Sequence, residues 1–269
     1  MINLFTWMFA HENFKIHVKK FLIFGFLFYT AGGVLAGTAS AMPKDLVTFI
    51  VMIAGLLLLA APSFALQGYY WCLTENVIDR RTEVLADSVY NGKVGTKESF
   101  ELPEFDIKKF IWRGIASSVA IFILIIPVVS LLVLCFIGGN SAGEFWNINP
   151  LQVNGIYILL FIMIALFFPA LLWNYAKRDS VLAVLNIRKA VYIIGNYPFR
   201  YLRNVILIFV LMLIVNTPIS LITFAIKSLF GTGTVYLILS NIFYFLAGIY
   251  MLFVFAYLHG TITPPGEGV

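Results

Sequence analysis

Hydrophobic residues fill six long stretches of the chain, and shorter polar connections separate them. The stretches lie at roughly 21–41, 46–70, 110–137, 151–173, 205–226 and 235–258. A helix that crosses a bilayer needs about 20 mostly apolar residues. The runs are continuous, whereas a β-barrel strand would alternate in polarity over about ten residues. The pattern therefore predicts an all-α, polytopic membrane protein with six transmembrane helices in a single integral membrane domain, 1–269.

Composition leads to the same class. The 269 residues are 61% hydrophobic and 12% charged, with a mean hydropathy of +0.94. Soluble globular chains are about 45–50% apolar and about 25% charged. This chain therefore has too few polar residues to present a polar surface to water on all sides.

The cationic residues are distributed unevenly between the two sides of these spans. Three Lys residues precede the first span, seven Lys or Arg lie around the second connection and six in the fourth, whereas the opposite side has only Lys44 and Lys227. The positive-inside rule then places both termini and the connections 71–109 and 174–204 in the cytoplasm. Since the chain also has no N-x-S/T sequon, we expect the plasma membrane of a bacterium or archaeon.

The first apolar stretch allows an alternative. A basic pair precedes the run 21–37, and Ala39-Ser40-Ala41 follows that run like the cleavage site of a signal peptide. Against cleavage, about twenty residues precede the run, and Gly33-x-x-x-Gly37 has the spacing of a helix-packing face. We favour a retained span.

The two cytoplasmic connections differ in charge. The first has mixed signs and a helical rhythm from Glu75 to Tyr90 that Asn91-Gly92 ends, which is typical of a solvated helix or of a docking surface for a soluble partner. In the second, Asp179 or Ser180 can cap an amphipathic, basic helix that ends at Gly195-Asn196. Such a helix is typical of the inner headgroup layer, where it serves either as a plain anchor or to recognise anionic lipid.

A motif recurs before the first, third and fifth spans. Phe14, Phe105 and Phe199 each precede basic residues and a span, and Pro127 and Pro218 recur within the third and fifth spans. This spacing predicts three helical hairpins of like orientation. A Phe next to basic residues is also common at an inner membrane interface, so the repeat has a simpler explanation.

Candidate binding residues fall into two groups, one at the cytoplasmic headgroup level and one near the midplane. The expected lipid- or anion-binding residues are Lys19, Lys20, Lys108, Lys109, Arg188, Lys189, Arg200 and Arg203. The possible midplane polar or kinked positions are Pro127, Asn216, Thr217 and Pro218. The span cores hold no carboxylate, Lys or His of the kind that ion coupling requires, and Arg113 near a span end is explained by snorkelling.

Enzymatic motifs are missing from the sequence. It contains no H-E-x-x-H, G-x-S-x-G or Walker-type pattern and no C-x-x-C pair. We therefore expect no catalytic residues, no metal, no cofactor and no nucleic-acid partner.

A further set of residues carries a family resemblance. These residues are Gly68, Tyr69, Leu102, Pro103, Glu104, Phe105, Asp106 and Gly114. Their pattern resembles a prokaryotic multi-pass membrane family known as domain of unknown function 4013. It is also similar to the membrane domain of some glycerophosphodiester phosphodiesterases. This sequence departs from the family pattern in its longer linker and in Ile107, where a second acidic residue is usual. The resemblance implies a fold and a lipid environment but no activity.

Two functions are compatible with the sequence. The first is a non-enzymatic membrane module whose cytoplasmic face engages anionic lipids or a partner complex, with a protein partner docking on 71–109. The second is a passive facilitator for a neutral or amphiphilic substrate, with a path near Pro127, Asn216 and Pro218.

Overall fold

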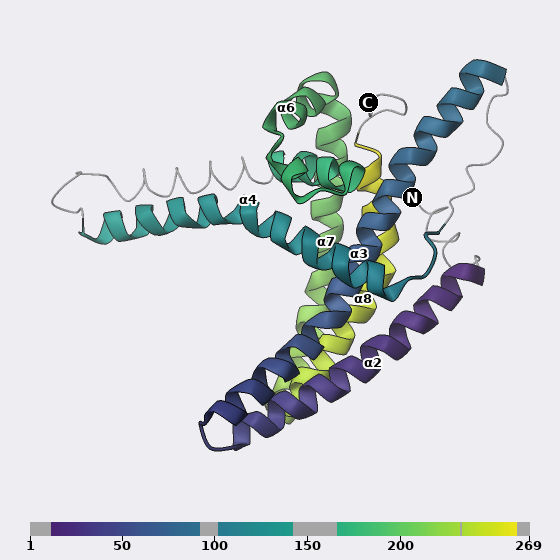
Figure 1. The fold of residues 1–269 in the computed structure, drawn as a ribbon. Coiled ribbons are helices and arrows are strands. Elements are labelled where there is room, and N and C mark those ends of the chain that lie inside the picture. Colours follow the sequence, from purple (N-terminus) through teal and green to yellow (C-terminus); the bar gives the residue numbers. More distant parts are fainter. Residues whose placement is uncertain (1–11, 92–101, 142–165, 232, 263–269) are drawn as a thin grey trace.

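The computed structural model describes residues 12–91, 102–141, 166–231 and 233–262, and every regular element in these ranges is a helix. The long helices are α2 (Glu12–Ala41), α3 (Leu46–Asn91), α4 (Ile107–Ser141), α7 (Pro198–Phe230) and α8 (Thr234–Gly260), which Figure 1 shows. A helix at 166–178, the 3₁₀ helix η1 (Val181–Leu185) and α6 (Ile187–Asn196) lie between α4 and α7. The all-α prediction is confirmed for these residues.

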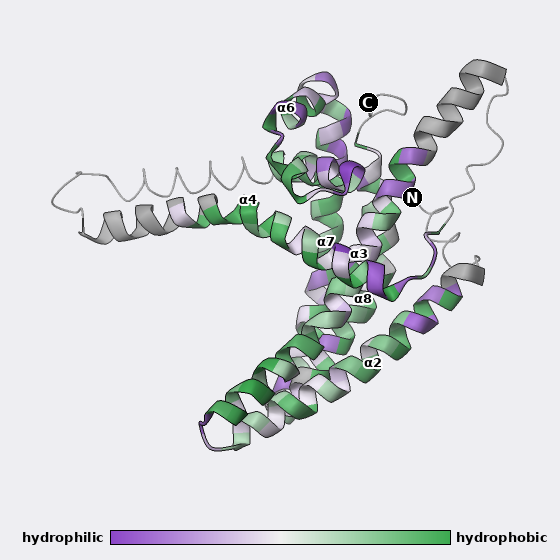
Figure 2. Ribbon diagram, in the orientation of Figure 1, coloured by the Kyte–Doolittle hydropathy of each residue, from purple (hydrophilic) through white to green (hydrophobic). Residues whose placement is uncertain are grey.

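Several of the helices can cross a membrane. α2, α3, α4 and α7 are long and apolar enough, and α8 counts as a fifth span if its two parts, bent by 47°, are taken together. Hydrophobic residues cover long stretches of these helices (Figure 2). A multi-pass helical membrane protein is therefore shown. The predicted span at 151–173 lies mostly outside the described residues, so the six-span count and the middle hairpin stay predictions.

Two antiparallel hairpins, α2–α3 and α7–α8, lie against each other. The Asp45 carboxylate accepts a hydrogen bond from the Thr48 N–H at 2.7 Å and caps the start of α3. Gly231, with a φ of 68°, ends α7 in the left-handed region that suits glycine. The predicted packing face of α2 meets α8, since a Cβ at Gly33 or Gly37 would collide with Ile238 or Thr234.

Aromatic side chains from four helices form one of the two buried apolar clusters of the bundle. Phe21 and Tyr29 of α2 are 1% and 2% exposed and pack with Tyr69, Phe110 and Phe245. In lipid, contacts of this kind hold helices together by van der Waals packing, because the surrounding chains are equally apolar. α2 is thus an integral part of the described bundle, and the retained first span stays a prediction.

Two local expectations need correction. The amphipathic helix predicted from Asp179 or Ser180 is broken at Asn186, where η1 ends and α6 begins. The Asn186 side chain accepts from the Lys189 N–H at 3.1 Å and caps α6, while Ser180 makes no side-chain cap bond. The Asn186 side-chain oxygen satisfies a backbone N–H group that would otherwise be free at the start of α6. The chain therefore begins a new helix there, and the short 3₁₀ helix η1 precedes it. The predicted end of α6 at Asn196 is confirmed.

Candidate functional site

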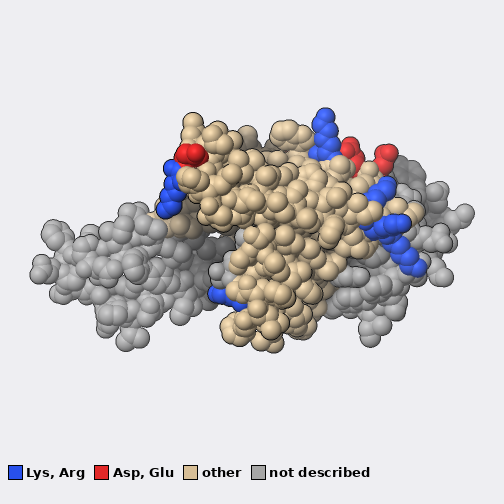
Figure 3. All heavy atoms as spheres, turned by 90° about the horizontal axis from the view of Figure 1, so that it is seen from below, with Lys and Arg blue, Asp and Glu red and all other residues tan. Residues whose placement is uncertain are grey.

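One end of the bundle, which we call the basic end, gathers most of the Lys and Arg side chains that the structure describes. It is formed by the N-terminal ends of α2, α4 and α7, the C-terminal ends of α8 and of the helix at 166–178, and the adjoining part of α3. Contacts among these segments, described below, show that they meet. Figure 3 shows the face that points downward in Figure 1. Most of the described surface of this face carries no Lys, Arg, Asp or Glu.

α3 and α4 cross in direct backbone contact near this end. A Cβ added to Gly68 would overlap the Phe110 carbonyl oxygen, and one added to Gly114 would overlap the Phe64 carbonyl oxygen. No residue with a side chain can occupy either position without separating the helices. Beyond the crossing, α4 runs away from the other long helices (Figure 1). The two glycines of the family motif therefore set how closely these two helices approach.

Arg113 lies one residue before this crossing and joins three segments. Its side chain is 3% exposed, and Nη1 donates to Glu75 of α3 at 2.5 Å. Its Nε lies 2.9 Å from the Asp179 carboxylate, as an ion pair without hydrogen-bond geometry. Nη1 also contacts Cys72 Sγ at 3.2 Å, and Nη2 donates to the Ala176 carbonyl at 3.2 Å.

This arrangement overturns the snorkelling interpretation of Arg113. The guanidinium points into protein rather than toward water, because two carboxylates and a backbone carbonyl compensate its charge there. The Tyr175 hydroxyl donates to the Arg113 carbonyl at 2.9 Å and ties the same helices together. Asp179, which the sequence suggested as a helix cap, instead serves as a counter-ion and has a φ of 47°.

A second polar network fastens α8 at the basic end. Buried His259 lies with Nε2 2.8 Å from the Pro169 carbonyl and Nδ1 2.7 Å from the Tyr70 hydroxyl. Since a carbonyl only accepts, Nε2 carries the proton and donates, which leaves Nδ1 of the neutral ring to accept from Tyr70. Asn204 of α7 donates to the Leu258 carbonyl at 3.0 Å and extends the fastening to α7.

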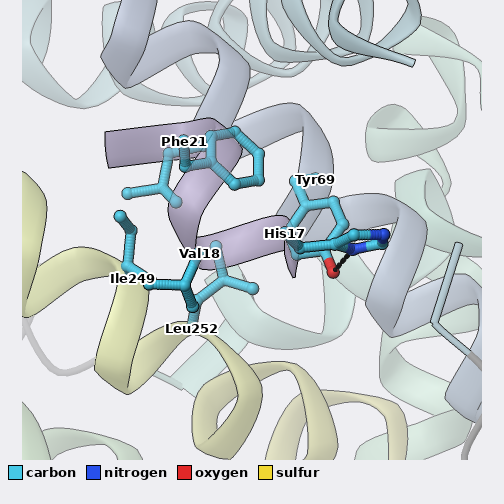
Figure 4. A pocket seen from close by; sticks show the side chains of 7 residues that line it. His17, Val18, Phe21, Tyr69, Ile249 and Leu252 are labelled. Atoms are coloured by element: carbon cyan, nitrogen blue, oxygen red, sulfur yellow. Dashed lines mark hydrogen bonds between the residues drawn. The ribbon is translucent and has the colours of Figure 1, made fainter. Parts of the chain in front are cut away.

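His17 and Tyr69 connect α2 to α3. The His17 ring bonds the Tyr69 hydroxyl at 2.7 Å, as the dashed line in Figure 4 shows. Beside this bond, Val18, Ile249 and Leu252 help to line a cavity of about 10 Å³, roughly the room that one water requires. This is a packing gap between α2, α3 and α8, too small for a ligand.

The linker motif packs on the same region and starts α4. Phe105 lies 5.1 Å from Phe21, centroid to centroid, and Lys20 Nζ lies 4.8 Å from its ring. Asp106 accepts from the backbone N–H groups of Lys108 and Lys109 at 3.0 and 3.1 Å, which is a side-chain N-cap. Leu102 packs on the same apolar cluster, Pro103 is half-buried and Glu104 is exposed.

All eight residues expected to bind lipid lie at the basic end. Those with exposed side chains are Lys19, Lys20, Lys108, Lys109, Arg188 and Arg203. Lys189 and Arg200 are half-buried. Their position suits contact with headgroups, and lipid binding by them stays a prediction.

Sequence reasoning missed a convergence of cations on Trp173. This side chain is 1% exposed, and its ring centroid lies 5.8 Å from Lys177 Nζ and 5.5 Å from Lys189 Nζ. Lys177 follows Trp173 by four residues, which places both on one helix face and is a usable sequence signal. The contribution of Lys189 from α6 is a long-range contact that no local pattern shows.

The predicted midplane residues Asn216, Thr217 and Pro218 line neither of the two described cavities. Asn216, Thr217 and Pro218 lie on α7, which continues as a helix through Pro218, and the Pro127 side chain lies outside the described part. A cavity of about 280 Å³ lies elsewhere, between α2, α3 and α8. Its polar lining comes from Tyr29, Ser63, Gln67, Tyr70, Asn241 and Tyr244.

The residues that the structure describes hold no group of three or more His, Cys, Asp or Glu side chains placed to bind a metal ion. Their buried polar groups at the basic end mainly fasten helices to one another. The arrangement offers cations, apolar surface and helix contacts at a membrane interface.

Comparison with known proteins gives one result. The profile of the family described as "Protein of unknown function (DUF4013)" matches residues 88–226, just over half of the chain. The matched region contains the linker motif, Arg113 and the cation group around Trp173, while Gly68 and Tyr69 precede it. No curated protein and no solved structure matches the chain. The similarity to the membrane domain of glycerophosphodiester phosphodiesterases stays a prediction, whereas the resemblance to domain of unknown function 4013 is confirmed, and the chain belongs to the DUF4013 family of proteins of unknown function.

Proposed function

We propose that this protein is a non-enzymatic membrane module whose basic end engages anionic lipids. In this proposal it lies in the plasma membrane of a bacterium or archaeon, with the basic end and both termini in the cytoplasm. A further span at 151–173 completes six spans in three hairpins. The charge asymmetry of the sequence supports this orientation.

The amphipathic surface of η1 and α6 carries the proposal. Leu182 and Ile187 are 70% and 61% exposed, although both are large and apolar. Arg188 and Lys189 follow directly, and no acidic residue lies between Ser180 and Asn196. Apolar side chains that water would otherwise surround, next to two cations, fit the boundary between acyl chains and anionic headgroups.

The buried polar groups support a role without catalysis. Arg113, His259 and Asn204 are each committed to carbonyls or counter-ions of neighbouring helices. Such groups orient helices at the interface and hold the amphipathic surface in place. A soluble partner on the 71–109 connection is a further part of the proposal, although most of that connection lies outside the described residues.

Lipid preference in purified protein tests the proposal. We expect thermal stability in nanodiscs to rise as phosphatidylglycerol replaces phosphatidylcholine. The double variant Arg188→Gln/Arg203→Gln should lose part of that rise, because both cations are exposed at the basic end. The matched control Lys44→Gln/Lys227→Gln removes two exposed cations elsewhere and should retain it. A wild-type protein indifferent to phosphatidylglycerol would contradict the proposal.

One observation favours a second candidate, a facilitator for a neutral amphiphile. The cavity of about 280 Å³ offers hydroxyl and amide groups among aromatic walls, and none of its lining residues is charged. Such a lining suits a hydroxyl or carbonyl head with an apolar tail. Gly248→Phe should fill the cavity and abolish the part of the transbilayer movement of a fluorescent fatty alcohol that exceeds its spontaneous rate in protein-free vesicles, while an unchanged excess would reject this function.

A further inference from the structure

Two cations from different helices approach the same buried indole. Lys177 extends from the helix at 166–178 and Lys189 from α6, and both ammonium groups lie within 6 Å of the Trp173 ring centroid. A cation near an aromatic face is attracted by the negative charge of the ring. The Asn174 side chain donates to the Asn186 carbonyl at 3.2 Å and fixes the distance between the two helices.

Among the described residues, this group of cations is only partly compensated. Burial lowers the pKa of Lys177, Arg178 adds to that effect, and Asp79 offsets part of it. Burial also lowers the pKa of Lys189, and the charges of Lys177 and Arg178 lower it further. Positive groups that repel one another are stabilised when an anion binds among them.

The same place holds an unused hydrogen-bond donor and an apolar border. The indole Nε1 of Trp173 is buried without an acceptor among the described residues. η1, which connects the two cation-bearing helices, leaves Leu182 and Leu185 70% and 52% exposed. A free inorganic anion would use the cations alone, whereas a phospholipid uses both the cations and the apolar border.

We propose that Lys177, Arg178 and Lys189 form a binding site for the phosphate of one anionic glycerophospholipid, whose acyl chains lie along Leu182 and Leu185. The site deepens the proposed function and depends on it. It differs from a diffuse basic surface because it takes one lipid at a defined place. It also includes Lys177 and Arg178, which the sequence suggested only as topological determinants.

Native mass spectrometry of the delipidated full-length protein in mild detergent tests the site. Titration with phosphatidylglycerol should show one tight binding event before weaker ones. The triple variant Lys177→Gln/Arg178→Gln/Lys189→Gln should lose about fivefold in affinity per cation, and roughly a hundredfold in all, for the first lipid only. The matched variant Lys177→Arg/Lys189→Arg keeps the charges and should keep the tight event. Size-exclusion profiles identify variants that fold.

The outcomes separate the site from the wider proposal. A wild-type protein without preference for phosphatidylglycerol over phosphatidylcholine would reject the proposed function and the site together. A preference that the triple variant retains in full would reject the site alone. Displacement of the first lipid by excess inorganic phosphate would show a simple anion site and would reject the lipid assignment. If the triple variant does not fold, Arg178→Gln alone gives the decision, since its side chain is exposed and an unchanged first affinity would reject the site.

Discussion

The Arg113 ion cluster allows a quantitative test of how the basic end is held together. Replacing Glu75 by Gln keeps the shape of the side chain and removes the charge opposite the guanidinium. The Arg113 side chain is 3% exposed and the Glu75 side chain 30%, so the remaining cation cannot be solvated by water. Breaking a buried pair in this way costs about 3–5 kcal/mol.

The structure sets the expected values for two variants. Glu75→Gln keeps the Ala176 carbonyl and the Asp179 charge near Arg113, so we expect the lower value of that range, about 3 kcal/mol. Asp179→Asn should cost less, about 1 kcal/mol, because the Asp179 side chain is 53% exposed. Asn also tolerates the left-handed backbone at this position. The double variant should lose more than the sum, since it leaves Arg113 without a counter-ion.

Thermal unfolding in detergent, followed by size-exclusion fluorescence, measures these differences. With about 2–4 °C per kcal/mol for a chain of this size, Glu75→Gln should lower Tm by about 6–12 °C and Asp179→Asn by about 2–4 °C. Glu104→Gln removes an exposed carboxylate at the same end and serves as the control. Glu75→Gln with the Tm of wild type would refute the reasoning, because Arg113 would then be hydrated rather than paired.

Further predictions concern the helix crossing, the helix cap and the topology. Gly114→Leu should separate α3 from α4 and abolish a monodisperse size-exclusion peak, whereas Gly195→Ala, with no atom within 4 Å of the added Cβ, should not. Asp106→Ala should cost about 1 kcal/mol through the lost N-cap, seen as a small fall in Tm, and Glu104→Ala should leave Tm unchanged. A cysteine at position 44, in a chain whose native cysteines are replaced by Ser, should react with an impermeant maleimide in intact cells. Labelling only after permeabilisation would reverse the proposed topology.

The helices themselves follow closely from the sequence. Continuous apolar runs predict α2, α3, α4, α7 and α8, because a helix needs only sufficient length and hydrophobicity to lie in lipid. Asn91 is the last described residue of α3, so the helix end predicted at Asn91-Gly92 stays a prediction. The break at Asn186 was missed because apolar spacing continued across it, and only the side-chain cap reveals it.

The contacts at the basic end could not be derived in the same way. Arg113 pairs with Glu75 and Asp179, which lie 38 and 66 positions away along the chain. Charge type alone did not distinguish Glu75 from the other acidic residues of its connection. The sequence therefore suggested snorkelling, which requires no partner. The hydrogen bonds of His259 could not be predicted either, because its partners Tyr70 and Pro169 come together only through the packing of three helices.

The proposed cation site and the ion cluster share one short segment, which would connect the proposed lipid binding to the helix crossing. Lys177 and Arg178 precede Asp179 directly, and Asp179 pairs with Arg113 one residue before Gly114. The Ala176 carbonyl, which also accepts from Arg113, lies one residue before Lys177. A phosphate held by Lys177 and Arg178 would therefore restrain the segment that positions the guanidinium. The same four residues, 176–179, would thus stabilise both headgroup binding and the α3–α4 crossing. Binding of a lipid at this segment would therefore alter the stability of the contact between these two transmembrane helices.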